Sequence, residues 1–76
     1  MIEVLEYLAR SLVDNPDAVE VTTAQRERGL VLWLRVDPED MGKVIGRSGR
    51  TARALRTMVR AAGTRVGASA FVEIVE

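Results

Sequence analysis

The sequence has 76 residues, of which 47% are hydrophobic, so we expect one domain with one core over residues 1–76. Cysteine and histidine are both absent, which excludes a disulfide framework, a thiolate metal site and the commonest general base. The formal net charge is zero, but residues 1–40 hold nine acids and four cations, whereas residues 41–72 hold seven cations and no acid. The charge is therefore dipolar, with a basic block in the second half of the chain.

The N-terminal segment carries Glu3 and Glu6 and has no cationic leader, so it does not read as a signal peptide. No apolar run approaches the length of a transmembrane helix. We therefore expect a cytoplasmic protein without a membrane segment.

The first half of the chain is predicted to form a helix and a β-hairpin. Apolar residues recur at helical spacing over residues 2–13, and Asn15-Pro16-Asp17 ends that helix. Residues 19–26 begin with an alternation rich in β-branched residues, which is typical of a strand. After a turn at Arg28-Gly29, residues 30–36 form a second, more buried strand.

The second half is predicted to form two helices and a strand. Asp37 as N-cap and Pro38 at the first helical position begin a short helix that ends at Gly46. A longer helix runs from about Gly49 to Ala62 and is ended by Gly63. One side of it is apolar and the other basic: Ala54, Leu55, Met58, Val59, Ala61 and Ala62 against Arg50, Arg53, Arg56 and Arg60. A loop with Arg65 and Gly67 then leads to a strand over residues 70–75.

The order helix, strand, strand, helix, helix, strand predicts an α+β fold. The first two strands pair antiparallel, and the last returns after a two-helix crossover to pair parallel with the second, through a right-handed connection. Residues 30–36 are then the middle strand of a three-stranded mixed sheet, with three helices on one face.

The strand parity predicts which residues lie on the uncovered face of this sheet. They are Val31, Trp33, Arg35, Phe71 and Val75. An exposed aromatic patch of this kind is often an interface. The alternative is that these residues only cover their own sheet.

The stretch "GKVIGRSGR", residues 42–50, is predicted to hold phosphate. Glycines let the turn adopt unusual backbone angles and let a ligand approach closely, and the first amides of the following helix are unpaired donors at its positive end. Lys43, Arg47 and Arg50 add mobile charge. The order of residues fits neither the Walker loop nor the dinucleotide fingerprint.

In this context "VIGRSG" resembles the (I/V)-I-G-x-x-G signature of the type II K-homology (KH) module. "LVDNPDAVEV", "PEDMGKVIG" and "RTARALRTMVRAAGT" are similar to the small bacterial single-KH proteins of the KhpA family. The resemblance covers nearly the full chain. It departs from many members at residues 63–69, which hold one cation here.

This resemblance implies an α+β type II KH domain that binds single-stranded RNA. It places Gly46, Arg47, Ser48 and Gly49 against the phosphates and Val44 and Ile45 beneath the bases. Strand 69–75 would be the opposite wall, with the loop 63–68 at its rim. Arg53 is a further candidate contact on the basic face of the helix.

The resemblance also implies protein partners and a cellular role for the protein. The partners are a second copy of the chain, a larger KH protein of the Jag (KhpB) type, or both. The role is that of a post-transcriptional regulator or RNA chaperone acting as a dimer, and the family is connected with cell shape and cell-wall pathways.

Two other function classes stay open: a DNA-binding module that imitates a helix-turn-helix, and a protein-interaction subunit whose G-x-x-G is vestigial. An enzyme is not expected, because no nucleophile or acid–base pair can be nominated. No cofactor, metal or small-molecule substrate is expected either.

Overall fold

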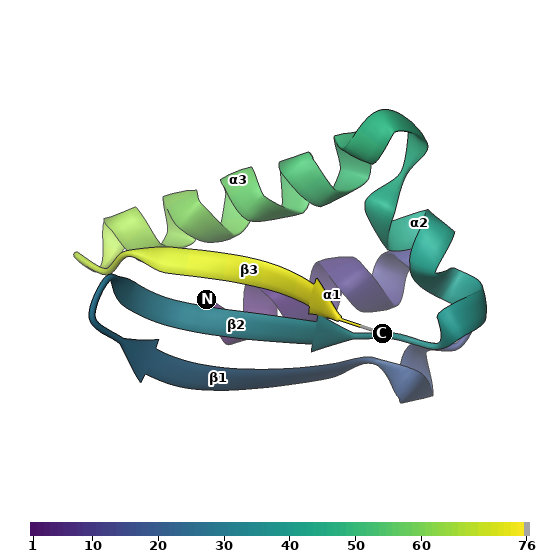
Figure 1. Ribbon diagram of the computed structural model, residues 1–76, viewed down its shortest axis with the longest axis horizontal. Coiled ribbons are helices and arrows are strands. Elements are labelled where there is room, and N and C mark those ends of the chain that lie inside the picture. The colour runs from purple at the N-terminus through teal and green to yellow at the C-terminus, as the bar shows by residue number, and fades with distance from the viewer. Residues whose placement is uncertain (76) are drawn as a thin grey trace.

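The computed structural model describes residues 1–75 and confirms the predicted order of elements (Figure 1). Helix α1 (Ile2–Leu12) precedes strands β1 (Glu20–Arg26) and β2 (Gly29–Arg35). Helices α2 (Met41–Ile45) and α3 (Arg50–Arg65) follow, and strand β3 (Ala70–Val75) is last. Short 3-10 helices connect these elements at Pro16–Ala18, Pro38–Asp40 and Arg47–Gly49.

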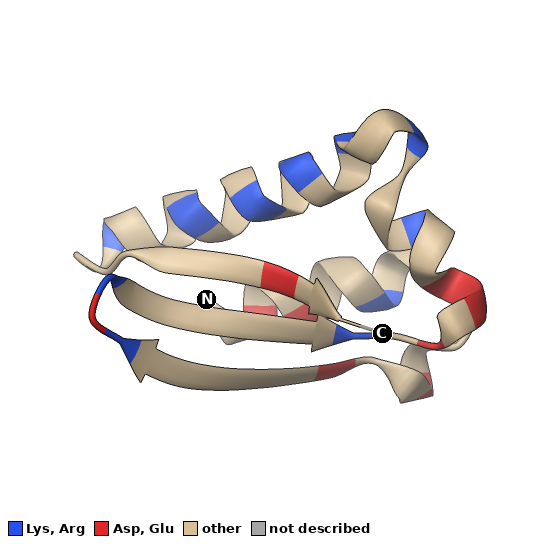
Figure 2. Ribbon diagram, in the orientation of Figure 1, with Lys and Arg blue, Asp and Glu red and all other residues tan. Residues whose placement is uncertain are grey.

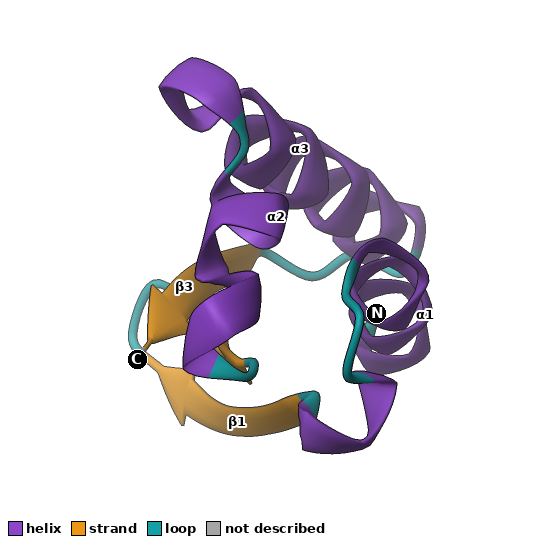
Figure 3. Cartoon of the chain, turned by 90° about the vertical axis from the view of Figure 1, so that its right-hand side faces the viewer, coloured by secondary structure: helices purple, strands orange, loops and turns teal. Residues whose placement is uncertain are grey.

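The sheet has the predicted mixed topology. Its strand order is β1-β2-β3, with β1 antiparallel and β3 parallel to the central strand β2. Figure 3, which views the molecule from one end, shows the helices on one side of the sheet only. The fold is thus α+β, with three helices on one face, as predicted.

The core lies between this face and the helices. Leu32 and Leu34 of β2 are fully buried, as are Leu5 of α1 and Val59 of α3. Burial alternates along β2, and Trp33, between the two leucines, is only partly buried. This alternation confirms the parity predicted for the strand, because side chains with a period of two point to opposite faces of a sheet.

The hairpin turn lies one residue earlier than predicted. Glu27 and Arg28 form the turn, and Gly29 already pairs with Arg26 as the first residue of β2. Gly29 has φ 143°, and a Cβ there would lie 2.8 Å from the Cβ of Ser69. Glycine is needed here both for this positive φ and for the close approach of the segment before β3.

The prediction that Gly63 ends the long helix is wrong. Gly63 is buried inside α3, which continues to Arg65 and is followed by Gly67 at φ 73°. A Cβ on Gly63 would lie 2.8 Å from the carbonyl oxygen of Ala68 and 3.3 Å from the Cβ of Ala70. The residue is small because the chain returns directly over it, a cause that sequence spacing does not reveal.

The buried stripe of α3 is also narrower than predicted. It consists of Ala52, Leu55, Val59 and Gly63. Three residues assigned to the apolar side are exposed instead: Ala54, Met58 and Ala61. Alanine is compatible with either side of a helix, so the wheel alone could not set the edge of the stripe. Within residues 1–75, no helix has both the length and the apolarity that crossing a membrane requires.

Candidate nucleic-acid interface

The G-x-x-G turn, residues Gly46–Gly49, reverses the chain between α2 and α3 through three residues with positive φ. Gly46 has φ 75°, Ser48 has φ 56° and Gly49 has φ 73°. The N–H of Gly46 donates to the carbonyl of Gly42 at 2.9 Å, which closes α2. The N–H of Gly49 donates to the carbonyl of Gly46 at 3.1 Å, which holds the turn together.

The two glycines of this turn differ in the space that surrounds them. A Cβ on Gly46 would collide with Thr51, whose own Cβ would be 2.8 Å away. A Cβ on Gly49 would meet nothing within 4 Å. The fold therefore needs Gly46 for packing, whereas the space beside Gly49 is open to a ligand.

The turn also presents backbone donors to solvent. Arg47 and Ser48 are exposed, and within residues 1–75 their N–H groups have no hydrogen-bond acceptor. They lie directly before α3, a helix of 16 residues, whose dipole favours negative charge at this end. Peptide donors and dipole together suit an anion such as a phosphate.

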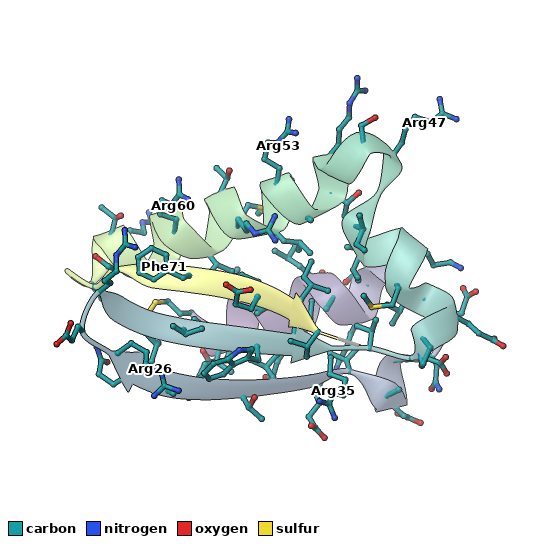
Figure 4. The ribbon with its side chains drawn as sticks, viewed as in Figure 1. Arg26, Arg35, Arg47, Arg53, Arg60 and Phe71 are labelled. Atoms are coloured by element: carbon teal, nitrogen blue, oxygen red, sulfur yellow. The ribbon has the colours of Figure 1, made fainter. Side chains whose placement is uncertain are left out.

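Arginine side chains extend this positive region along α3. Figure 2 shows the cations as a row of blue segments on that helix, and in Figure 4 Arg47, Arg53 and Arg60 point away from the sheet. Neither these three nor Arg50 is in an ion pair within the described part of the chain. Their charge is therefore not neutralised by the protein itself.

Lys43 differs from the other predicted cations. Its Nζ lies 3.2 Å from Oδ2 of Asp14 and 3.7 Å from Oδ1 of Asp40. The hydrogen bond that Lys43 donates to Asp14, followed by the charge of that carboxylate, raises the pKa of Lys43 above its usual value. Lys43 is thus held in ion pairs with acids from the first half of the chain, and its contact with a ligand stays a prediction.

Asp40 is the centre of this contact and is buried, with 3% of its surface exposed. Its carboxylate accepts the N–H groups of Asp14 at 3.3 Å and Asn15 at 3.1 Å. The loop after α1 is thereby fastened to the start of α2, which positions the turn that follows. The spacing Asp40-x-x-Lys43 was visible in the sequence, but the participation of Asp14 was not.

The two apolar residues before the turn take separate places. Val44 is fully buried in the core, whereas Ile45 is 38% exposed. Of the pair expected beneath the bases, only Ile45 is therefore accessible to a ligand, and Val44 is part of the core.

Arg56 is the residue whose position the sequence did not indicate. The helical spacing places it on the basic face with Arg53 and Arg60, but its Nε donates to the carbonyl of Val72 in β3 at 3.3 Å. Arg56 thus bridges α3 and β3, the strand that is expected to form one wall of the groove. Where α3 ends and β3 begins lies a hollow of about 210 Å³, lined by Arg60, Thr64, Ala68, Ser69, Ala70 and Phe71.

Comparison with known proteins gives consistent matches over this chain. The family model described as the KH domain of KhpA/KhpB matches residues 2–74. The RNA-binding protein KhpA of Streptomyces coelicolor is 60% identical over 63 residues, which are 83% of this chain and 80% of that protein. Its namesake from Aquifex aeolicus is 49% identical over 74 residues, covering 97% of this chain and 94% of the relative.

A further relative, the RNA-binding protein KhpA of Clostridium acetobutylicum, is 48% identical over 75 residues, which are 99% of this chain and 100% of that protein. Among solved structures, a crystal structure of Era from Aquifex aeolicus superposes with a TM-score of 0.66 at 20% identity. The match covers 95% of this chain and 28% of the Era chain, and at this identity it supports the fold alone.

Proposed function

The chain belongs to the KhpA/KhpB family of KH domains, and we propose that it binds short single-stranded RNA at the G-x-x-G turn. The observation that carries this proposal is the open side of Gly49, next to two peptide N–H groups that have no acceptor, and to arginines that have no ion pair, within residues 1–75. A phosphate diester matches these features, because it is an anion with exposed oxygen acceptors.

In the proposed complex the turn clamps the RNA backbone. The N–H groups of Arg47 and Ser48 donate to phosphate oxygens, and the glycines let the backbone approach without a Cβ in the way. Arg47, Arg50 and Arg53 supply charge. Lys43, already paired with two acids, lies at the margin of the site and contributes less.

Base contacts come from the groove beside the turn. Ile45 offers an exposed apolar surface, and the α3–β3 side of the groove is bounded by Arg56 and β3. These groups read shape and stacking more than sequence, so we propose a modest base preference.

A site of this size makes few contacts, so useful affinity requires a second RNA-binding module held nearby. We propose that this module is a second copy of the chain or a larger KH protein of the Jag (KhpB) type. The role that fits such binding is that of a post-transcriptional regulator or RNA chaperone in the cytoplasm, with no catalytic step.

The experiment that tests the clamp is the double substitution Arg47→Asp with Ser48→Asp. The chain offers a matched control, because Arg10-Ser11 on α1 repeats the same dipeptide at exposed positions. Arg10→Asp with Ser11→Asp changes the net charge equally, but on a different element. Both proteins should keep the circular dichroism of the folded state, since all four sites are exposed.

We expect ultraviolet crosslinking to a single-stranded RNA to be lost in the Arg47/Ser48 variant and kept in the Arg10/Ser11 variant. Equal crosslinking by both would contradict the clamp. The same titration with duplex DNA at equal salt separates the remaining class of ligand. Tighter binding to duplex DNA than to single-stranded RNA would favour the helix-turn-helix alternative.

A further inference from the structure

The hollow where α3 ends and β3 begins, here named the corner, has no acid in its lining. Its volume is about 210 Å³. Helix α3 contributes Arg60 and Thr64, the segment before β3 contributes Ser69, and β3 contributes the ring of Phe71. The corner is smaller than the roughly 300–1,000 Å³ of a pocket for a drug-sized ligand, so it fits a single flat ring.

Phe71 is the aromatic group of the corner and is 38% exposed. Its ring also lines a second hollow on the sheet side, together with Arg28. The guanidinium carbon of Arg28 lies 5.9 Å from the ring centre, and Arg28 does not line the corner. The ring of Phe71 is thus covered by a cation on the sheet side and left open on the side of α3.

The corner is separate from the G-x-x-G turn but joined to it by a row of cations. The turn lies at the other end of α3, a helix of 16 residues and therefore about 24 Å long. The bridge from Arg56 to the carbonyl of Val72 lies between the two sites, and Arg60 follows one helical turn later. Figure 4 shows Arg60 and Phe71 at the same end of the molecule, with Arg53 between them and the turn.

The charges around the corner favour an anionic ligand on the side of α3. The N-terminal amine nearby is already paired with Glu3 at 3.7 Å. The other charged groups have no ion pair within residues 1–75. Both acids among them line the hollow on the sheet side, and neither lines the corner. These groups are the acids Glu27 and Glu73 and the cations Arg26, Arg28, Arg60 and Arg65.

We propose that the corner binds a nucleobase of the same RNA strand whose backbone is held at the G-x-x-G turn. The proposal rests on the proposed function and adds a second site to it. The base enters from the side of α3 and stacks on the ring of Phe71, and Arg60 pairs with an adjacent phosphate. Ser69 is exposed and offers its hydroxyl group to the edge of the base.

A base of the tethered strand is favoured over other occupants. A phosphate alone is a poorer ligand, because the negative end of the α3 dipole lies here and the backbone provides no anion site. An apolar side chain of another protein would gain nothing from the unpaired arginines that lead to the corner. A strand already held at the turn raises the local concentration of its own bases, so weak stacking is sufficient.

The length of α3 sets the length of RNA that reaches both sites. The G-x-x-G turn of a KH domain clamps about four nucleotides. A stacked strand advances about 3.4 Å per nucleotide, so the roughly 24 Å of α3 correspond to about seven nucleotides. An oligonucleotide of four residues should therefore reach only the turn, whereas one of eight should reach the turn and the corner.

The first test compares oligoadenylates of four and eight nucleotides, with dissociation constants measured from the amide resonances of residues 46–49. Phe71→Leu keeps an apolar side chain but removes the ring. This variant should bind the longer RNA at least about fivefold more weakly than the unmodified chain and the shorter RNA equally well. Tyr7→Leu is the matched control, because Tyr7 is an aromatic residue on α1 that is 71% exposed, and it should change neither affinity.

Two further measurements locate the base and the phosphate. Phe71 is the single phenylalanine of the chain, so its ring resonances should shift with the longer RNA and stay fixed with the shorter one. Arg60→Gln should reduce the log–log salt slope of the longer RNA by about 0.7 and leave that of the shorter RNA unchanged. Arg10→Gln, on α1, should change neither slope.

The outcomes separate this site from the clamp at the turn. Equal affinity of the folded Phe71→Leu variant and the unmodified chain for the longer RNA would overturn the second site and leave the clamp intact. Equal losses for both lengths would overturn it too, because Phe71 would then act through the fold. Ring resonances of the unmodified chain that stay fixed with the longer RNA would overturn it without any substitution. An unmodified chain that binds neither oligonucleotide would refute both the RNA function and this site.

Discussion

Substituting each glycine of the G-x-x-G turn by alanine should separate a glycine required by the fold from one required by the ligand. Gly46 has φ 75° and ψ 170°, a region that is essentially restricted to glycine. Its added Cβ would also collide with Thr51. Gly49 has φ 73° and ψ 15°, the ordinary left-handed region, and its added Cβ would meet open space.

These geometries give different magnitudes. At Gly46 the backbone strain costs about 1–3 kcal/mol and the overlap a further 1–3 kcal/mol, less about 0.5–1 kcal/mol gained by restricting the unfolded chain. We expect Gly46→Ala to lower the free energy of unfolding by about 3 kcal/mol. At Gly49 only the left-handed penalty of about 1–2 kcal/mol applies, so the net loss is about 1 kcal/mol or less.

Urea unfolding followed by circular dichroism measures both values. A difference of about 2 kcal/mol between the variants would be a large fraction of the stability of so small a domain. Equal destabilisation by the two substitutions would refute the reasoning, because it would mean that Thr51 does not restrict Gly46.

RNA affinity should be sensitive to the substitution that the fold tolerates, Gly49→Ala. The methyl group of Gly49→Ala enters the space that we assign to the phosphate, so this variant should lose affinity while it remains folded. A folded Gly49→Ala variant with unchanged affinity would show that no ligand atom approaches the backbone there.

Three further predictions concern packing, pH and salt. Gly63→Val should destabilise the fold by about 2 kcal/mol or more in urea unfolding, because its Cβ would lie 2.8 Å from the carbonyl oxygen of Ala68. A stability equal to that of the unmodified chain would contradict this packing. The N–H of Glu39, and then the amide of Asn15, lower the pKa of Asp37 below its usual value of 3.8. The stability from Asp37 is therefore fully present above pH 3.8 and lost as the pH falls through the lower folded value, and Asp37→Ala should show a shallower decline in acid titrations. RNA affinity should fall with salt at a log–log slope of about −2 for three phosphate contacts, and Arg53→Ala should reduce this slope by about 0.7; an unchanged slope would remove Arg53 from the interface.

Much of this fold followed from local patterns in the sequence. The alternation in residues 30–36 identified the central strand and the face turned to the helices. Asp37 and Pro38 marked the start of the segment that leads to α2, and Asp37 does accept the N–H of Glu39. The crossover of two helices was enough to predict the parallel pairing of β3. These features depend on short-range geometry, which one sequence contains.

The sequence predicted the structure less well where contacts between different segments determine it. A glycine that ends a helix and a glycine under a crossing chain look the same in sequence, so the pattern at Gly63 predicts a helix end. The ion pair of Lys43 with Asp14 does not appear in the local sequence, because the two residues are far apart along the chain. Arg56 could not be distinguished from its neighbours until β3 was in place.

The candidate site was predicted in its position but not in its detail. The spacing of glycines and cations located the turn, and the structure then showed why Gly46 and Gly49 are not equivalent. It also separated Val44, in the core, from Ile45, at the surface. Such distinctions depend on where side chains lie after packing, which no periodicity encodes.

A nuclear magnetic resonance titration of the labelled protein with a short single-stranded RNA tests the central claim most directly. The proposal predicts that the amide signals of residues 45–50 and of the first turn of α3 shift with a common affinity. The indole signal of Trp33, on the sheet face opposite the helices, should not follow that curve. Shifts centred on Trp33 and Phe71, with the amides of Gly46–Gly49 unmoved, would contradict the proposed RNA clamp.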